Sequence, residues 1–502
     1  MAKYNNSCNY NTTPLITGIG YQAQLLSPTQ DRNTAVGAFA LTNNTDGTEN
    51  TALGFEALFS NIGGQTNTAI GVQSMRSNVS GLYNTAIGWQ SMYSNTTGLA
   101  NTAIGYQALR SNITGKDNTA VGYNALLNNI VDNSTAVGAT ALQNNTTGVS
   151  NTAAGWGALF SNTTGSNNTA MGMQSMFANT FGNFNTAVGK DSLTTNTTGI
   201  NNTAVGYQAL QLNIASNLTA VGFQALQNNS IGSNNTAVGY LAMQNNTTGS
   251  SNTAIGDQVL KNNTIGTNNT AVGDGALQSN TTGTANTAVG YQALPDNTTG
   301  INNVAIGGNA LGNLVSGSYN TVFGFNAGSA YTGSESSNVV LGGPGVVGDN
   351  HTIRIGDTGA GPAQQTTCFI AAINGVTISS GTAVFIKSDG QLGTTVSSRR
   401  YKTNIQDIGN ESSGIYNLRP VTFSYKTLET KEKQIGLIAE EVESVYPELV
   451  VYNEKNEPET VQYHLLPTLL LNEIQRLHGV INELTSKGVE LINRLEKLEQ
   501  KN

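Results

Sequence analysis

Apolar and polar positions follow one pattern that repeats along most of the chain. A Thr marks each copy except one, in which Val304 takes its place, and successive markers lie 17 positions apart, with two steps of 16. The consensus unit reads N-T-A-V-G-Y-Q-A-L-Q-N-N-T-T-G-S-N. The 18 copies open at Thr34, Thr51, Thr68, Thr85, Thr102, Thr119, Thr135, Thr152, Thr169, Thr186, Thr203, Thr219, Thr236, Thr253, Thr270, Thr287, Val304 and Thr321. A fixed period of this length predicts a solenoid of stacked, nearly identical coils.

Each unit contains one clear strand signal. The T-A-V-G segment predicts a short strand that enters a turn at Gly, and N-N-T-T-G predicts a second turn. The Y-Q-A-L-Q segment fits either a second strand or a single helical turn. We expect Ala103, Ile104, Ala108 and Leu109, with their counterparts in other coils, to stack into inward-facing ladders. Aromatic residues after the first Gly, such as Tyr106, are interpreted as structural filling rather than as a binding stripe.

A single coil of this kind cannot be stable alone. Burial of one Val, one Leu and two Ala contributes roughly 5–6 kcal/mol. Ordering 17 residues costs on the order of 25 kcal/mol of conformational entropy. Hydrogen bonds and dispersion between stacked coils must supply much of the difference, and association of several chains would add to it.

The composition divides the chain into four regions. Residues 1–32 are polar and are interpreted as a cap or attachment segment. Residues 33–350 form the repeat solenoid, or shaft, and 351–396 carry short strand signals that predict a β-rich neck. Residues 397–502 differ, because they hold 29 of the 52 charged residues. The predicted fold is therefore mainly β: a long parallel β-solenoid, a neck, and an α+β domain that ends in a coiled-coil helix at about 465–500.

Charge and cysteine content exclude several classes of function. The net charge of −8 argues against a nucleic-acid-binding surface. Cys8 and Cys368 are the two cysteines, too few for a disulfide framework or a metal cluster, and we expect no metal and no cofactor. No apolar run reaches 18 residues, so no membrane insertion is expected. Residues 1–32 lack the features of a secretion signal, which predicts synthesis in a cytoplasm.

The C-terminal residues repeat with the spacing of a coiled coil. Their intervals alternate between 3 and 4 over four heptads, which predicts self-association without distinguishing two strands from three. The predicted seam consists of Ile474, Leu477, Ile481, Leu484, Gly488, Leu491, Leu495 and Leu498.

Five motifs follow one another in residues 397–502. They are S-x-x-R-x-K at Ser397–Lys402, P-V-x-F-x-Y-K at Pro420–Lys426, G-L-I-A-x-E-V at Gly436–Val442, Y-P-E-L-V at Tyr446–Val450, and the terminal heptads. Together they closely resemble the endosialidase-type intramolecular chaperone domain. This self-cleaving serine peptidase family is found at the ends of phage tail fibres and tailspikes. The resemblance covers about one fifth of the chain.

The resemblance implies a homotrimer whose last domain guides shaft folding and then cuts itself off. It implies cleavage between Val396 and Ser397, with Ser397 as nucleophile and Lys402 as general base. A Lys amine whose pKa is lowered by burial can activate a Ser hydroxyl. Arg400 would order the segment or stabilise developing charge. Ser398 stands where the family often has Asp, and we count it as a supporting residue.

These inferences predict a homotrimeric viral fibre on the virion surface, with its own copies as partners and a host receptor or glycan as a candidate ligand. The first alternative is a bacterial cell-surface adhesin, because Asn84–Gly88 and its copies remotely resemble the head repeats of trimeric autotransporter adhesins. The second is a trimer clamp that does not cleave. A glycan-hydrolysing tailspike would need paired carboxylates at a cleft, and the repeats contain almost none.

Overall fold

The chain divides into two compact units, residues 1–366 and 367–502. A computed structural model of the chain describes residues 16–24, 32–357, 382–387, 391–426, 432–453 and 455–500. Most of the predicted segment 1–32 and the neck strand expected at 368–373 lie outside the described residues.

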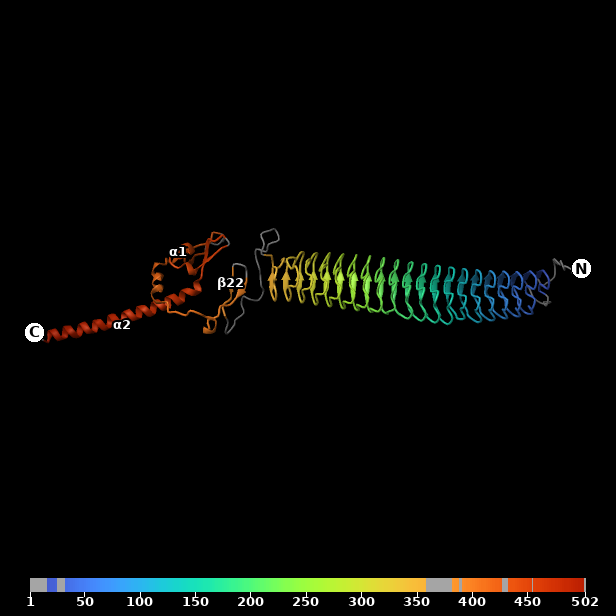
Figure 1. The fold of residues 1–502 in the computed structure, drawn as a ribbon, viewed down its shortest axis with the longest axis horizontal. Helices are drawn as coiled ribbons and strands as arrows, with labels where there is room; N and C mark the ends of the chain where they lie inside the picture. The colour runs from blue at the N-terminus through green and yellow to red at the C-terminus, as the bar shows by residue number, and fades with distance from the viewer. Residues whose placement is uncertain are drawn as a thin grey trace. The chain divides into compact units, whose positions relative to one another are not determined.

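The first unit is a parallel β-sheet of 21 short strands, one from each coil (Figure 1). Successive strands pair in one register, so that Ala103 lies beside Ala120. The strands are β1 (Ile16–Ile19), β2 (Asn33–Val36), β3 (Thr51–Leu53), β4 (Thr68–Ile70), β5 (Thr85–Ile87), β6 (Thr102–Ile104), β7 (Thr119–Val121), β8 (Thr135–Val137), β9 (Thr152–Ala154), β10 (Thr169–Met171), β11 (Thr186–Val188), β12 (Thr203–Val205), β13 (Thr219–Val221), β14 (Thr236–Val238), β15 (Thr253–Ile255), β16 (Thr270–Val272), β17 (Thr287–Val289), β18 (Val304–Ile306), β19 (Thr321–Phe323), β20 (Val339–Leu341) and β21 (Ile353–Ile355). The predicted parallel solenoid is confirmed.

The segment after each strand is a series of turns, neither a second strand nor a helix. In the coil that begins with β6, Gly105 has φ +135°, and a Cβ there would lie 2.4 Å from the carbonyl oxygen of Gly122 in the next coil. Only glycine tolerates this close stacking of backbones. Gln107 and Leu109 adopt left-handed backbone at φ 52° each, which turns the chain back beneath its sheet.

Fewer side chains of each coil face the interior than the sequence predicted. Ala103, Ala108 and Leu109 are fully buried, as expected, and their counterparts continue the same core along the shaft. The expectation for Ile104 was wrong, because its side chain is 37% exposed. Successive residues of a strand point to opposite faces. With Ala103 directed inward, Ile104 must point outward.

Buried asparagines fill the space that the sequence analysis assigned to plain turns. They form two ladders, both fully or almost fully buried. The strand ladder is the Asn that precedes the first Thr or Val of a coil, a position that Ser134 and Leu218 take in two coils: Asn33, Asn50, Asn67, Asn84, Asn101, Asn118, Asn151, Asn168, Asn185, Asn202, Asn235, Asn252, Asn269, Asn286, Asn303, Asn320 and Asn338. The turn ladder is the second Asn of N-N-T-T-G: Asn44, Asn61, Asn78, Asn95, Asn112, Asn129, Asn145, Asn162, Asn179, Asn196, Asn213, Asn229, Asn246, Asn263, Asn280 and Asn297.

Both ladders join neighbouring coils by hydrogen bonds. In the strand ladder, Oδ1 of Asn101 accepts from the backbone N of Asn118 at 3.0 Å and from its Nδ2 at 3.1 Å. In the turn ladder, Nδ2 of Asn112 donates to Oδ1 of Asn95 at 2.9 Å. The carbonyl of Gly115 accepts from both ladders, from Asn101 at 2.8 Å and Asn112 at 3.1 Å. Each coil is therefore tied to the next by side chains as well as by strand pairing.

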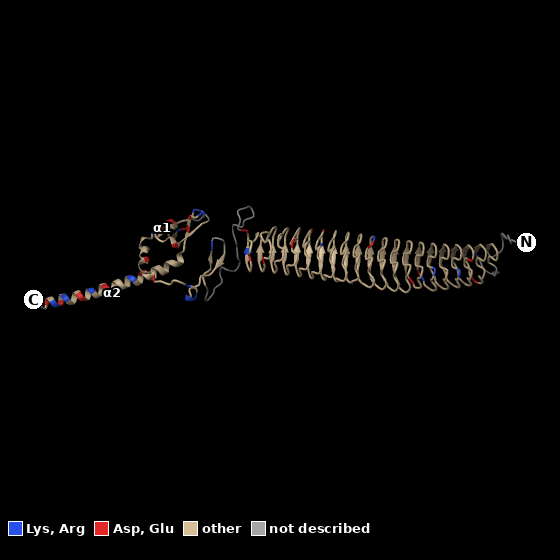
Figure 2. Ribbon diagram, in the orientation of Figure 1, with Lys and Arg blue, Asp and Glu red and all other residues tan. Residues whose placement is uncertain are grey.

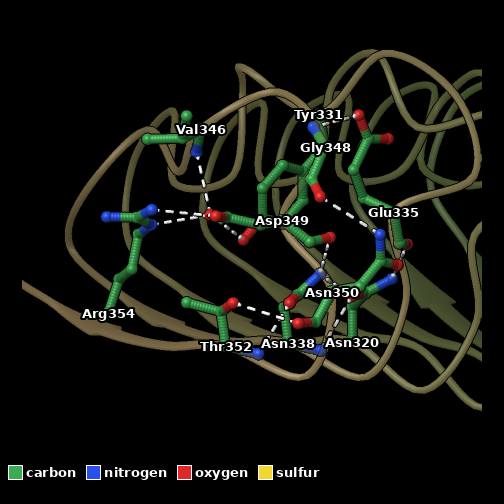
Figure 3. A network of polar contacts seen from close by, with 10 residues as sticks. All are labelled: Asn320, Tyr331, Glu335, Asn338, Val346, Gly348, Asp349, Asn350, Thr352 and Arg354. Carbon is green, nitrogen blue, oxygen red and sulfur yellow. Dashed lines mark hydrogen bonds and ion pairs between the residues drawn. The ribbon is translucent and has the colours of Figure 1, made fainter. Parts of the chain in front are cut away.

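A carboxylate network closes the C-terminal end of the shaft (Figure 3). Asp349 accepts from Arg354 through Nε at 2.6 Å and Nη2 at 2.8 Å, and from the backbone N of Val346 at 3.0 Å. The hydroxyl of the fully buried Tyr331 donates to the same carboxylate at 3.2 Å. Chiefly through the hydrogen bond from Arg354, these donors lower the pKa of Asp349, although burial opposes them.

The carboxylate of Glu335 also accepts hydrogen bonds from backbone amides. Its carboxylate accepts from the backbone N of Gly333 at 3.0 Å and of Gly348 at 3.2 Å. Burial alone would raise the pKa of Glu335, but the backbone donors outweigh it and the pKa is lowered. The G-x-G-x-x-G pattern at 343–348 therefore directs amides at protein carboxylates, in a loop that follows β20 rather than opening a helix.

The second unit combines short strand pairs, 3-10 turns and a long helix. Its strands pair antiparallel as β22 with β23, β24 with β25 and β26 with β27. Its elements are β22 (Phe385–Ile386), β23 (Leu392–Gly393), 3-10 helix η1 (Arg399–Tyr401), 3-10 helix η2 (Gly409–Asn417), β24 (Val421–Phe423), β25 (Gln434–Gly436), α1 (Ala439–Glu443), 3-10 helix η3 (Pro447–Leu449), β26 (Val450–Tyr452), β27 (Pro458–Val461), 3-10 helix η4 (Tyr463–Leu465) and α2 (Leu466–Glu499). A small core packs α1 and η3 on the last strand pair and consists of Val442, Tyr446, Leu449, Val450 and Val461.

Candidate functional site

The predicted cleavage segment is extended backbone followed by one 3-10 turn, η1. Val396 and Ser397 belong to no helix or strand. Ser398 caps η1, because its hydroxyl accepts from the backbone N of Arg400 at 3.4 Å. The turn ends at Lys402, whose backbone N donates to the carbonyl of Arg399 at 3.2 Å. The residues predicted as nucleophile and base therefore lie on either side of η1.

The environment of this segment is open and basic. Ser397 and Lys402 are both exposed in the single chain, and no hydrogen bond joins their side chains within described residues 391–426. The guanidinium of Arg400 lies over the ring of Tyr401, 5.5 Å from its centroid, and its Nε donates to Ser398 Oγ at 3.3 Å. Arg400 thus orders the turn. In the single chain neither the Ser397 nor the Lys402 side chain is buried.

The predicted strand motif and the start of the G-L-I-A motif lie side by side as paired strands. Val421 of β24 pairs with Gly436 of β25. Arg419, just before β24, forms a two-pronged ion pair with Glu441 of α1, and its hydrogen bond is the main cause that lowers the pKa of Glu441. The backbone N of Leu437 donates to the hydroxyl of Tyr463 at 2.8 Å. The motifs therefore build one lobe rather than separate sites.

A polar cluster that joins η2 to the start of α2 was not predicted from the sequence. The fully buried hydroxyl of Ser412 donates to Glu473 at 2.8 Å and accepts from Nδ2 of Asn472 at 2.7 Å. Arg476 donates to the same Glu473 carboxylate at 2.7 Å. With the Ser412 bond as the largest cause, these donors lower the pKa of Glu473. The signal was present, because Asn472 and Glu473 interrupt the apolar run that opens the helix.

The remaining candidates for chemistry are few. His464 lies against the ring of Phe385 with centroids 4.5 Å apart, and His478 lies on the exposed part of α2. Across the described ranges, no group of three or more His, Cys, Asp or Glu side chains is placed to hold a metal ion. Of the helices that the structure describes, none is long and apolar enough to cross a membrane.

Charged side chains are scattered sparsely along the shaft and lie more densely in the second unit (Figure 2). The molecule therefore combines a repetitive parallel β-solenoid with a charged α+β domain that carries a long helix. Residues 397–451 match a protein-family model described as the chaperone of endosialidase. The chain carries a domain of this family near its C-terminus, as the sequence motifs predicted. No curated protein and no solved structure matches the chain.

Proposed function

We propose that the chain is one subunit of a homotrimeric fibre whose C-terminal domain assembles the shaft and then cuts itself off. The observation that carries the proposal is the position of the family match, which begins at Ser397. This is the residue that the motif assigns as nucleophile, and it directly follows the proposed scissile bond. Members of this peptidase family act in trimeric proteins and cleave their own chain, and association with phage tail fibres favours a virion fibre.

The proposed reaction uses only groups of the chain and water. Ser397 Oγ attacks the carbonyl carbon of Val396, and the neutral amine of Lys402 takes the hydroxyl proton. The C–N bond between Val396 and Ser397 then breaks, the proton passes to the departing nitrogen, and an ester links Val396 to Ser397 Oγ. Water hydrolyses this ester. The products are a carboxylate at Val396 and a free amine at Ser397.

Assembly would supply what the single chain lacks. The Ser397 and Lys402 side chains are exposed in one subunit, whereas an amine becomes a base at neutral pH when desolvation lowers its pKa. Packing of neighbouring subunits around η1 would provide this burial. Cleavage would then follow trimer formation rather than precede it.

The test compares the full chain with Ser397→Ala, Lys402→Arg and the control Ser398→Ala. Intact mass spectrometry should find fragments of about 396 and 106 residues for the unaltered chain and for Ser398→Ala. The Ser397 and Lys402 variants should stay whole, because one lacks the nucleophile and the other holds its proton at any accessible pH. If the unaltered chain forms trimers but stays whole, the C-terminal domain is a trimer clamp without peptidase activity. Cleavage in Ser397→Ala but not in Ser398→Ala would move the nucleophile to Ser398.

A further inference from the structure

The outer face of the shaft's sheet carries an unbroken apolar row. The last residue of every strand from β1 to β21 is apolar, and strand pairing places each one beside the next, for example Val121 beside Ile104. We call this row the outer ladder. It consists of Ile19, Val36, Leu53, Ile70, Ile87, Ile104, Val121, Val137, Ala154, Met171, Val188, Val205, Val221, Val238, Ile255, Val272, Val289, Ile306, Phe323, Leu341 and Ile355.

The outer ladder is not part of the core of one chain. Leu53, Ile104 and Val137 are 45%, 37% and 44% exposed, whereas the Ala before each of them is fully buried. Parallel sheets occur almost only where both faces are covered. Here the coil's own turns cover one face, and the apolar outer face has no cover within the described residues of a single chain. A row of this length on a monomer would be an aggregation hazard.

We infer that the outer ladder is the face through which copies of this chain pack along the shaft. The occupant must repeat at the same interval over 21 strands, and a second copy has that spacing by construction. The inference rests on the proposed trimer and specifies which face of the shaft forms it. Parallel association through α2 would bring equal rungs level with one another.

The area is sufficient for a stable interface. A half-exposed Val or Ile presents roughly 50 Å², so the full ladder offers on the order of 1,000 Å² per chain, against the roughly 800 Å² that each partner contributes to a standard interface. No charged side chain lies on the ladder. The turns carry exposed apolar residues at some coils only, for example Ile113 at 47%, and at the same turn position of the preceding coil stands Thr96, whose hydroxyl donates to the carbonyl of Ile113 at 3.0 Å.

Site-specific cross-linking tests the face directly. The full chain with Cys8→Ser and Cys368→Ser serves as the parent, and its mass in solution is measured by light scattering. Val238→Cys places a thiol on the outer ladder, and Thr248→Cys places one on an exposed turn of the same coil. A second pair, Ile104→Cys and Thr114→Cys, repeats the comparison elsewhere on the shaft. Each variant is treated with bismaleimidoethane and separated on a denaturing gel.

The inference predicts dimer and trimer bands for Val238→Cys and Ile104→Cys, and at least tenfold fewer for the turn variants. Thr248 is exposed and Val238 only partly so, while Thr114 and Ile104 are both exposed, so poorer access to the turn thiols cannot explain this result. A trimeric parent with cross-links at the turns and none at the ladder would overturn the inference and leave the proposed trimer standing. A monomeric parent would overturn both.

A charge on the ladder supplies a second readout. Val238→Lys should lower the thermal midpoint of the trimer or release monomers, whereas Thr248→Lys should change neither. The circular dichroism of both variants reports whether the coils remain folded. Equal trimer stability for the two variants, with folded coils in each, would show that the ladder is not the interface.

Discussion

At the scale of single residues, the shaft depends on buried amides more than on large apolar side chains. Each coil buries small residues such as Ala103 and Ala108 and a single Leu109. The asparagine ladders supply directional bonds in the remaining space. A buried amide is favourable only when its donors and acceptors are paired, and the repeating coils pair them with their own copies. The recurrence of Asn at these two positions therefore contributes to stability and is more than a sequence bias.

The turn ladder gives a matched pair of substitutions. Asn162 is bonded on both sides, donating to Asn145 at 2.7 Å and accepting from Asn179 at 2.8 Å. Asn297 is the last rung, and its Oδ1 is buried without a partner, because Leu314 takes the next position. Replacement by Leu should cost about 2–4 kcal/mol of local stability at 162. At 297 the cost should be smaller by about 1 kcal/mol. Leu there breaks the bonds that Nδ2 donates to Asn280 and Gly300, as at 162, but it breaks no accepted bond and orphans no donor in the next coil.

Hydrogen exchange measured by mass spectrometry reads this difference coil by coil. Asn162→Leu should speed amide exchange in the coils on either side of it, while Asn297→Leu should speed it less and only toward the preceding coil, which holds Asn280. Equal effects of the two substitutions on exchange would mean that the hydrogen bonds of the Asn side chain contribute little to stability, and that the size of the side chain determines it.

The carboxylate of Asp349 predicts acid sensitivity at the end of the shaft. Because Arg354 and backbone donors lower the folded-state pKa of Asp349, its stabilisation is present above the unfolded value of about 4. It is lost as the pH falls through the lower folded pKa. Residues 331–354 should therefore open before the middle of the shaft as the pH falls below about 4, measured by amide exchange corrected for the intrinsic rate. Asp349→Asn should open them at neutral pH and weaken the acid dependence, of which Glu335 supplies the remainder; an unchanged pH profile would contradict this role.

Sequence alone predicted the inward Ala and Leu positions but not the side that Ile104 takes. A three-residue strand is too short for its alternation to reveal which face is inside, and apolar character favoured the wrong answer. The buried asparagines were equally hidden, because Asn is common in turns and its burial becomes favourable only when copies stack. Ser412 and Glu473, 61 residues apart, meet only in the folded domain.

At the scale of elements, strand and helix differ in how well the sequence determines them. The 17-residue period was sufficient to predict the strand of each coil and its parallel pairing, since repetition leaves one way to stack. The Y-Q-A-L-Q segment was undecidable, because its turns depend on left-handed backbone at residues such as Gln107 and Leu109. The heptads predicted α2 correctly. Its seam residues, such as Leu484 and Leu491, are exposed in one chain, as expected for a surface that another copy covers.

The glycine in the seam of α2 gives a prediction for this helix. Gly488 occupies a predicted core position, and a Cβ there would meet no atom of the same chain within 4 Å. Gly488→Leu should stabilise the assembled helices by more than the roughly 1 kcal/mol that helix propensity alone gives. The control Gly479→Ala lies off the seam and should give the propensity gain only. Thermal unfolding followed by circular dichroism compares them; a larger gain at 479 would place the seam on another face.

At the scale of the whole molecule, uniform repetition creates a problem of register. A slip of one coil between two chains would still place Val beside Val and Thr beside Thr, so the shaft alone selects its register weakly. A distinct domain at one end removes this ambiguity, because its own contacts exist once per chain. If that domain is cut off after assembly, the separated shaft cannot readily repeat the process. The trimer would then be maintained by a slow unfolding rate.

This scheme predicts that cleavage depends on assembly through α2. Leu484→Asp places a charge in the predicted seam and should both block trimer formation and abolish cleavage at Val396–Ser397, because η1 then stays exposed. Asn482→Asp introduces the same residue two positions earlier, off the seam, and should leave both intact. Light scattering measures the mass in solution, and intact mass spectrometry measures the cut. Cleavage in monomeric Leu484→Asp would show that one chain completes its own Ser397–Lys402 pair and that assembly does not control the reaction.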